Sequence, residues 1–263
     1  MSKIVFSGFG SNSFSALNTV SFIYDNGHEK MLVDCGASAL YNIHATVSSL
    51  CDISYCFISH SHFDHFLGLP YFIIGRNLDA IARKKSNPDY IAPDLTVFIQ
   101  KGLSDSVMSL LSLCHPDVKK LNFNVKFVEL TDSLNYVGEH FRVTAQSVNH
   151  SVTTYAMTIY EGTNKVLSYS SDTLYSDSII EFLRGAKTAI IEGMVPDDQQ
   201  AFSLKAKHAT FSDAINASKK IGAERTIVVH LQPRYYSQLE AINDMLKANG
   251  NINFPKPGEW YEV

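Results

Sequence analysis

Hydrophobic and polar positions alternate along the first part of the chain in short runs that are typical of β-strands. Three such runs occupy residues 4–6, 20–24 and 30–33. The pair Asn26-Gly27, between the second and third runs, is a strong signal for a hairpin turn. From residue 36 to residue 50 the spacing changes, because Leu40, Ile43 and Val47 recur at intervals of three to four. The start of the chain therefore predicts a hairpin of strands followed by a helix over 36–50.

The rest of the chain alternates between runs of strand length and runs of helix length. Strand patterns lie at 54–59, 95–99, 125–129, 141–147, 154–160, 166–170, 188–192 and 225–229. Helical patterns lie at 103–114, 174–184, 211–221 and 237–249. Strand-rich segments followed by strand–helix units favour an α/β fold with two sheets and with helices outside them. Without a linker or repeat, residues 1–263 are expected to form a single domain.

Composition excludes several classes of protein. The chain has 263 residues, of which 45% are hydrophobic and 18% charged, as in ordinary globular proteins. No apolar run approaches the roughly 18 residues of a membrane span. A formal net charge of −4 argues against broad electrostatic binding to nucleic acid, and lysines such as Lys205 and Lys207 are expected at a solvated surface. The 4 cysteines are too few for a disulfide scaffold, so we expect buried, reduced thiols and a cytoplasmic location.

The strand predicted at 54–59 leads directly into His60-Ser61-His62-Phe63-Asp64-His65. A lone histidine is usually structural, but three histidines and a carboxylate within six residues are hard to explain as core packing. Neighbouring imidazoles repel each other when protonated, so their convergence indicates a bound cation. Neutral imidazole and carboxylate are the ligands that zinc, manganese and iron prefer. The motif therefore predicts a metal site, in which His60 and His62 serve one position while Asp64 and His65 reach a second.

Three further candidates follow other predicted strands directly. They are His150, Asp172 and His230, each placed where a rigid sheet presents polar groups to a cleft. The histidines at 28, 44, 115 and 140 lie in predicted turns or on helix faces and are expected at the surface.

The order H-x-H-x-D-H, a lone histidine, a lone aspartate and a final histidine resembles the metallo-β-lactamase superfamily along nearly the whole chain. The resemblance implies the αββα sandwich, an α/β fold in which two mixed β-sheets face each other with helices outside. It also implies two metal ions, Zn²⁺ or alternatively Mn²⁺. By that pattern the first metal is held by His60, His62 and His150, the second by Asp64, His65 and His230, and Asp172 bridges both. An aspartate rather than a cysteine at position 172 argues against a true β-lactamase.

The C-terminal third resembles the tRNase Z group of phosphodiesterases. Glu192 ends a predicted strand, His208-Ala209-Thr210 follows sixteen residues later, and the chain continues through His230 to Arg234-Tyr235. In that group an extra histidine, paired with the glutamate, protonates the leaving ribose oxygen. The resemblance implies that His208 is the general acid and that Glu192 orients it. Asp64, beside the attacking water, would orient that water or accept its proton.

One departure from tRNase Z concerns the substrate. That group carries a long tRNA-binding arm between the lone histidine and the bridging aspartate, whereas here 21 residues (151–171) separate the two. They predict two strands joined by a hairpin turn at 161–164. Without the arm, and with a net negative charge, precursor tRNA is not an expected substrate. A compact, armless chain resembles the anti-Pycsar family, phage and bacterial homodimers with two zinc ions per subunit that hydrolyse cyclic nucleotide signals.

The leading hypothesis is thus a dimetal phosphodiesterase that converts 3′,5′-cyclic nucleoside monophosphates of several bases (cCMP, cUMP, cAMP and cGMP) to 5′-monophosphates and so counteracts cyclic-nucleotide antiphage signalling. The alternatives are a tRNase Z-type 3′ RNA-processing endonuclease, another hydrolase of the metallo-β-lactamase fold, and a non-catalytic sensor. A sensor needs no general acid, which argues against it. The apolar segment 69–93, which follows the metal motif, is expected in the core or in a subunit contact.

Overall fold

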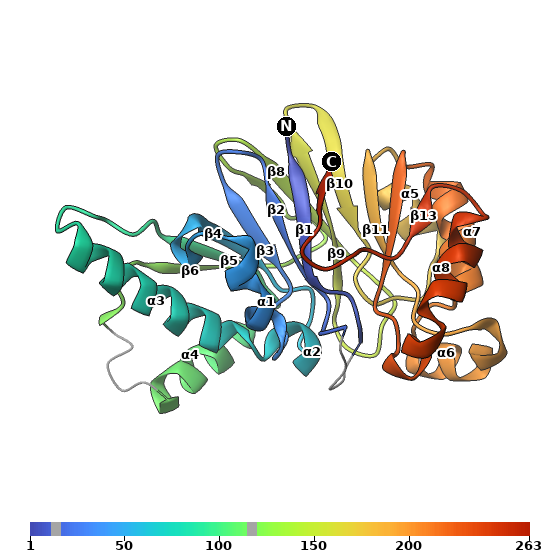
Figure 1. Ribbon diagram of the computed structural model, residues 1–263, viewed down its shortest axis with the longest axis horizontal. Coiled ribbons are helices and arrows are strands. Elements are labelled where there is room, and N and C mark those ends of the chain that lie inside the picture. The colour runs from blue at the N-terminus through green and yellow to red at the C-terminus, as the bar shows by residue number, and fades with distance from the viewer. Residues whose placement is uncertain (12–16, 115–119) are drawn as a thin grey trace.

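Two β-sheets pack face to face in the computed structural model, which describes residues 1–11, 17–114 and 120–263 without the side chains of residues 44 and 45 (Figure 1). In spatial order the first sheet contains β14 (Trp260–Glu262), β1 (Lys3–Gly8), β2 (Ser21–Asp25), β3 (Lys30–Val33), β4 (Ile53–Phe57), β5 (Leu95–Ile99) and β6 (Val125–Glu129). The second contains β13 (Ile252–Asn253), β12 (Arg225–Val229), β11 (Thr188–Glu192), β10 (Asn164–Tyr169), β9 (Tyr155–Glu161), β8 (Arg142–Ser147) and β7 (Asn135–Val137).

Both sheets are mixed, as the sequence predicts. Strands β3 to β6 run parallel to one another, and β14, β1, β2 and β3 pair antiparallel. In the second sheet β10 to β13 are parallel and β7 to β10 are antiparallel. Polar groups placed directly after the parallel strands therefore gather at the carboxyl edge, where sheets of this kind bind ligands.

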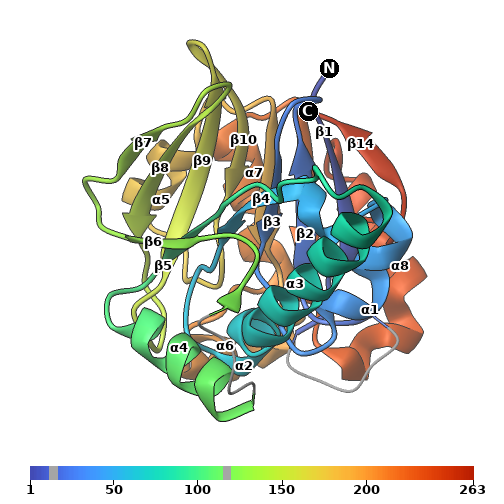
Figure 2. The ribbon, with the colours of Figure 1, turned by 90° about the vertical axis from the view of Figure 1, so that its left-hand side faces the viewer.

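Helices cover the two outer faces (Figures 1 and 2). They are α1 (Ala39–Thr46), α2 (Phe63–Phe66), α3 (Leu69–Ser86), α4 (Leu103–Cys114), α5 (Asp177–Leu183), α6 (Gln200–Ala206), α7 (Phe211–Ile221) and α8 (Leu239–Lys247). Helices α1, α3 and α4 pack on the first sheet, and α5, α7 and α8 lie on the second. Short 3₁₀ helices occupy Leu50–Asp52, Asp197–Gln199 and Pro233–Gln238. No helix among the described residues is long and apolar enough to cross a membrane.

The alternation along each strand divides its side chains between two apolar clusters. In β1, Ile4 and Phe6 belong to the cluster between the sheets, while Val5 belongs to the cluster under α1, α3 and α4. This follows from the period of two along a strand. The rings of Phe22, from the first sheet, and Tyr169, from the second, meet edge to face at 5.4 Å. The two sheets thus share one continuous core.

Many predicted elements are confirmed, seven of them without change of boundary: β3, β5, β6, β11, β12, α4 and α7. The helix predicted over 36–50 is wrong at both ends. It starts only at Ala39. Gly36, where a side chain would come within 2.0 Å of the Asp64 carbonyl oxygen, packs instead against the metal motif. The helix ends at Thr46, and a separate 3₁₀ turn begins after Ser49, whose hydroxyl accepts from the Cys51 amide.

Three further expectations are corrected. The segment after the metal motif contains the long helix α3, begun by Pro70 at its first turn, whereas the sequence reading placed no helix there. The helix predicted over 174–184 starts only after Ser176, whose side chain caps it, and the one predicted over 237–249 is α8, preceded by a 3₁₀ turn. All four cysteines are free thiols, but Cys114 is exposed rather than buried.

Candidate metal centre

The histidine motif occupies the turn between β4 and α2. His62 is the N-cap of α2, which carries Asp64 and His65 in its single turn. The Cys35 amide donates to the His65 carbonyl at 2.7 Å, and the Gly68 amide donates to the Cys35 carbonyl at 2.8 Å. These bonds tie the turn to the segment that follows β3. Together with the close approach of Gly36 to the Asp64 carbonyl oxygen, they fix the position of the motif.

Three imidazole nitrogens converge in a first group of donors. His60 Nε2 lies 3.1 Å from His62 Nδ1, which lies 3.2 Å from His150 Nε2. Asp172 Oδ2 completes the group at 3.7 Å from His60 Nε2 and 4.0 Å from His150 Nε2. Ligands about 2.0–2.1 Å from a tetrahedral zinc ion are separated by roughly 3.3 Å, so this spacing fits a metal. Burial lowers the pKa of His60 and of His150, which leaves both imidazoles neutral, as a ligand must be.

A second group of donors shares Asp172 with the first. Asp172 Oδ2 lies 3.4 Å from His65 Nε2 and 3.1 Å from His230 Nε2. Asp64 Oδ2 lies 3.7 Å and 3.4 Å from the same two nitrogens. Within the described residues, the buried His65 Nε2 has no hydrogen-bond partner, as expected of a nitrogen that serves as a metal ligand. The residues present thus fit two neighbouring divalent ions with one carboxylate between them.

Several of these imidazoles also contact the protein through their other nitrogen. His60 Nδ1 lies 2.9 Å from Ser59 Oγ, and His150 Nδ1 donates to the Lys207 carbonyl at 3.0 Å. His65 Nδ1 lies 2.7 Å from a carboxylate oxygen of Asp34. Contacts of this kind fix the orientation of an imidazole and direct its Nε2 at the metal.

Asp34 is a buried residue of the centre that the sequence reading missed. It follows β3 directly, with a left-handed φ of 54°, and is 0% exposed. Besides His65 it accepts from the Ser59 amide at 2.8 Å, from the Ser59 hydroxyl at 2.9 Å and from the Tyr169 hydroxyl at 2.7 Å. The available signal was its place directly after a buried strand, which is the criterion that selected Asp172 and His230.

Glu192 and His208 form a pair beside the donor groups. Glu192 ends β11, is 0% exposed, and lies 2.5 Å from His208 Nδ1 through Oε1. Its Oε2 accepts from the Thr173 amide at 2.7 Å. His208 Nδ1 is 4.0 Å from Asp172 Oδ2, so the pair reaches the centre itself. Burial opposes a charge on His208, but Glu192 raises the pKa of the imidazole above its ordinary value.

All nine sequence-predicted site residues therefore meet at one edge of the two sheets. The residues predicted at the surface behave less uniformly. Lys205 is exposed, but Lys207 is half-buried and its ammonium donates to the His150 carbonyl at 3.0 Å, which corrects the expectation for that side chain. His28 and His140 are exposed, with their rings stacked at 4.3 Å. The side chain of residue 44 and all of residue 115 lie outside the described residues.

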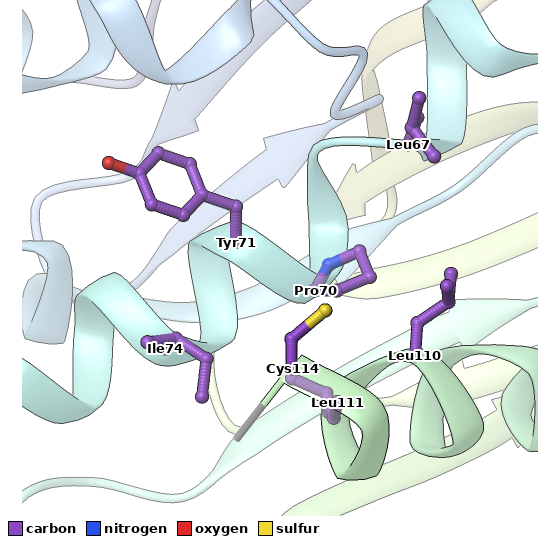
Figure 3. Close-up of a pocket in the computed structure, with 7 residues that line it drawn as sticks. All are labelled: Leu67, Pro70, Tyr71, Ile74, Leu110, Leu111 and Cys114. Carbon is purple, nitrogen blue, oxygen red and sulfur yellow. The ribbon is translucent and has the colours of Figure 1, made fainter.

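An apolar groove lies beyond the centre, on the outer side of the first sheet (Figure 3). It has a volume of about 330 Å³ and is bounded by α4 and by the segment that runs from α2 into α3. Its lining residues are Leu67, Pro70, Tyr71, Ile74, Leu110, Leu111 and Cys114. Leu67 follows His65 by two positions, so the groove begins beside the metal motif, but no metal donor lines it.

Two facing mixed sheets with a histidine–aspartate cluster at their carboxyl edge define a metal-dependent hydrolase of the metallo-β-lactamase fold. Residues 2–261 match the sequence model of the family described as Anti-Pycsar protein Apyc1, and the chain belongs to that family. It is accordingly a metal-dependent phosphodiesterase of the metallo-β-lactamase superfamily.

Known relatives and solved structures agree with this fold along the chain. The Ribonuclease Z of Limosilactobacillus fermentum is 23% identical over 89% of this chain and 88% of its own length. The probable metallo-hydrolase YhfI of Bacillus subtilis is 26% identical over 95% of each chain. Among solved structures, the short form of human tRNase Z superposes with a TM-score of 0.79 at 18% identity, covering 99% of both chains. The YhfI structure superposes with a TM-score of 0.78 at 21% identity, covering 100% of this chain and 99% of that one.

Proposed function

We propose that this protein hydrolyses 3′,5′-cyclic nucleoside monophosphates of several bases to 5′-monophosphates, and that it thereby counteracts cyclic-nucleotide antiphage signalling. The observation that carries the proposal is the Glu192–His208 pair, which stands 4.0 Å from the shared carboxylate of Asp172. A phosphodiester needs a proton for its departing alkoxide, and a histidine paired with a buried glutamate is suited to give one. A thioester releases a thiolate, which leaves without such help.

We propose two Zn²⁺ ions per subunit, with Mn²⁺ as the alternative. The first would be held by His60, His62 and His150, the second by Asp64, His65 and His230, with Asp172 shared between them. Bound there, such ions neutralise phosphoryl oxygens and make a water nucleophilic near neutral pH.

The protein's own groups would then divide the proton transfers. Asp64 is the carboxylate positioned to orient the attacking water or accept its proton. His208 has its Nδ1 engaged by Glu192, which leaves Nε2 to present a proton to the departing 3′ oxygen. Glu192 is itself fixed by the amides of Thr173 and Ala209, at 2.7 Å and 3.3 Å, so the imidazole has a rigid support.

The region between His150 and Asp172 favours a small substrate. Strands β9 and β10 are joined by a tight turn in which Gly162 has a left-handed φ of 57°. No described residue in this interval forms an arm that could hold a tRNA. The ribonuclease Z relatives nevertheless favour one second candidate, an endonuclease that trims RNA 3′ ends.

Turnover of cyclic AMP, GMP, CMP and UMP, measured beside a precursor tRNA that carries a 3′ trailer, tests the two candidates. Each reaction is run with Zn²⁺ or Mn²⁺ and repeated with a chelator. We expect chelator-sensitive release of 5′-monophosphates and intact tRNA. Trailer cleavage with untouched cyclic nucleotides would replace the proposal by the RNA-processing function.

Replacement of the general acid separates its role from metal binding. We expect His208→Ala to lower kcat by about 10²–10⁴-fold, because the leaving oxygen loses its proton donor. The metal content, measured by atomic emission, should stay at the wild-type value. The matched control is His140→Ala, which removes an exposed imidazole that stacks on His28 and is not among the metal donors. Loss of metal in His208→Ala would make His208 a ligand instead.

We further propose that the chain forms one domain over residues 1–263 and acts as a homodimer in the cytoplasm of a bacterial or phage-infected cell. Free thiols support a reducing compartment. The apolar groove between α3 and α4 supports an interface with a second copy, since two of its lining side chains are exposed: Tyr71 is 70% exposed and Leu67 is 49% exposed. Light scattering of the wild type and of Tyr71→Glu tests the dimer: a wild-type monomer would exclude it.

A further inference from the structure

Lys207 and His150 are joined by two reciprocal hydrogen bonds. The imidazole Nδ1 of His150 donates to the Lys207 carbonyl, and the Lys207 ammonium donates to the His150 carbonyl, both at 3.0 Å. The two residues are 57 positions apart in the sequence. The bonds therefore connect the loop after β8 with the C-terminal end of α6, two segments that no described strand pairing holds together at this point.

The backbone at Lys207 adopts a conformation that suits glycine. Lys207 is the C-cap of α6, with φ 59° and ψ 52°. A side chain is disfavoured in this left-handed region, and glycine adopts it freely. The lysine therefore carries a strain that glycine would avoid, while it makes a contact that glycine cannot make.

Of the two lysines at the end of α6, Lys207 is the one whose ammonium contacts the His150 loop. Within the described residues, the Lys207 ammonium pairs with no carboxylate, and it donates to the His150 carbonyl. Lys205, two positions earlier on the same helix, is exposed. Removal of Lys205 or of Lys207 therefore takes away the same charge, but only the removal of Lys207 breaks the contact with His150.

We propose that Lys207 is a positioning residue for the metal position of His60, His62 and His150. Its ammonium holds the His150 backbone while its carbonyl holds the His150 ring, so that Nε2 remains 3.2 Å from His62 Nδ1. This rests on the proposed role of His150 as a ligand. It does not depend on which phosphodiester is hydrolysed. Partners of this kind change metal affinity by about 10–100-fold when removed.

Zinc titration of the metal-free protein against a competing chromophoric chelator tests the proposal. The variants are Lys207→Met, which removes the ammonium, and Lys207→Gly, which also relieves the backbone. Lys205→Met is the matched control, and circular dichroism checks that each variant is folded. We expect the wild type and Lys205→Met to bind two equivalents alike. Both Lys207 variants should bind one equivalent at least 10-fold more weakly and the other unchanged.

The glycine variant distinguishes positioning from a general structural role. If Lys207 had no part in positioning His150, Lys207→Gly would bind zinc as the wild type does and, with its backbone strain relieved, would melt at a higher temperature without metal. Wild-type affinity in both Lys207 variants overturns the proposal. If the wild type takes up a single equivalent, the two-metal function fails, and His150→Ala shows whether that equivalent needs His150. If binding of that equivalent needs His150, the Lys207 variants must bind it more weakly than the wild type does. An unchanged zinc affinity in these variants overturns the proposal.

Discussion

The buried carboxylate of Asp34 accepts hydrogen bonds from four donors, which belong to Ser59, His65 and Tyr169. Ser59 precedes His60, and its amide and hydroxyl both donate to Asp34. The imidazole of His65 and the hydroxyl of Tyr169 complete the set. Because a buried carboxylate is stable only when it is well hydrogen-bonded, these contacts orient the metal-binding turn and satisfy the charge at once.

We expect Asp34→Asn to weaken zinc binding by about 10–100-fold, since an amide cannot accept from all four donors. The free energy of unfolding should fall by about 2 kcal/mol, as for the loss of buried bonds to a charged group. Chelator competition and urea denaturation measure the two effects. Tyr169→Phe is the control, because it removes one donor and should cost about 1 kcal/mol with little change in zinc affinity. Full zinc affinity in Asp34→Asn would contradict this role.

The limits of prediction at this scale follow from what a motif contains. The donors from His60 to His65 are dense enough in sequence to be recognised, and His150, Asp172 and His230 follow strands as expected. Asp34 acts on His65 from 31 positions earlier, so only the folded chain brings the two together. Lys207 was expected in solvent, because nothing in its sequence neighbourhood indicates the His150 carbonyl.

Element ends around the centre show the same dependence on tertiary contacts. Non-glycine residues with positive φ among the described residues are Asn18, Asp34, Ser171, Lys207 and His230. Four of the five are site residues or lie next to one. Backbone in this region is strained and is typical of functional sites. The strands thus end in sharp turns that direct donors inward, a feature that strand propensity cannot reveal.

The ends of the helices were predicted less well than their centres. Helix α7 has clear signals at both ends, since its N-cap Thr210 forms a capping box with Asp213 and its C-cap is Gly222. The helix α3 was missed although Phe72, Ile73 and Ala80 are all buried on one face. Its exposed Tyr71 and its Gly75 obscure the helical period.

Stability at acidic pH should depend on the junction between α3 and the turn at Leu50–Asp52. Asp79 of α3 accepts from the Ser49 hydroxyl and, at 3.4 Å, from the Cys51 amide. Partial burial opposes its charge, but these bonds lower its pKa overall. A carboxyl whose pKa is lower in the folded state stabilises the protein above its unfolded pKa of about 3.9, and this contribution is lost as pH falls through the folded value.

Asp79→Asn should therefore lower the free energy of unfolding by about 1 kcal/mol at pH 7 and have a smaller effect near pH 3. Urea denaturation at both pH values measures the difference. The exposed Asp89 supplies the control, and Asp89→Asn should change little at either pH. An equal loss from Asp79→Asn at both pH values would refute the electrostatic explanation.

On the scale of the whole molecule, the donors come from both sheets. His60, His62, Asp64 and His65 follow β4 of the first sheet, while His150, Asp172 and His230 follow strands of the second. A bound metal would therefore join the sheets at their carboxyl edge. The order of the elements predicted two sheets with helices outside them, and the family resemblance implied that these sheets face each other. The pairing of β13 and β14 with the sheet edges was not predictable, since both are too short to show a pattern.

Zinc should raise the melting temperature of the metal-free protein, because the assembled donor set exists only in the folded state. At a free concentration 100 times Kd, one site adds about 2.7 kcal/mol. For a chain of this size that corresponds to a rise of roughly 5–10 °C. Scanning calorimetry with zinc, and with chelator added back, measures the shift. Magnesium is the control, since it prefers oxygen ligands. An unchanged melting temperature in zinc would argue against binding across the sheets.

The spread of the donors along the chain also bears on how the protein is made in the cell. His230 lies 170 residues after His60 (230 − 60). At roughly 5–20 residues per second, a ribosome needs about 10–30 s to pass from one to the other. During that interval the emerging chain holds its first four donors without the complete set of partners. The whole donor set therefore exists only after the last strands have been translated, so a metal ion that needs all of its ligands would have to enter after that point.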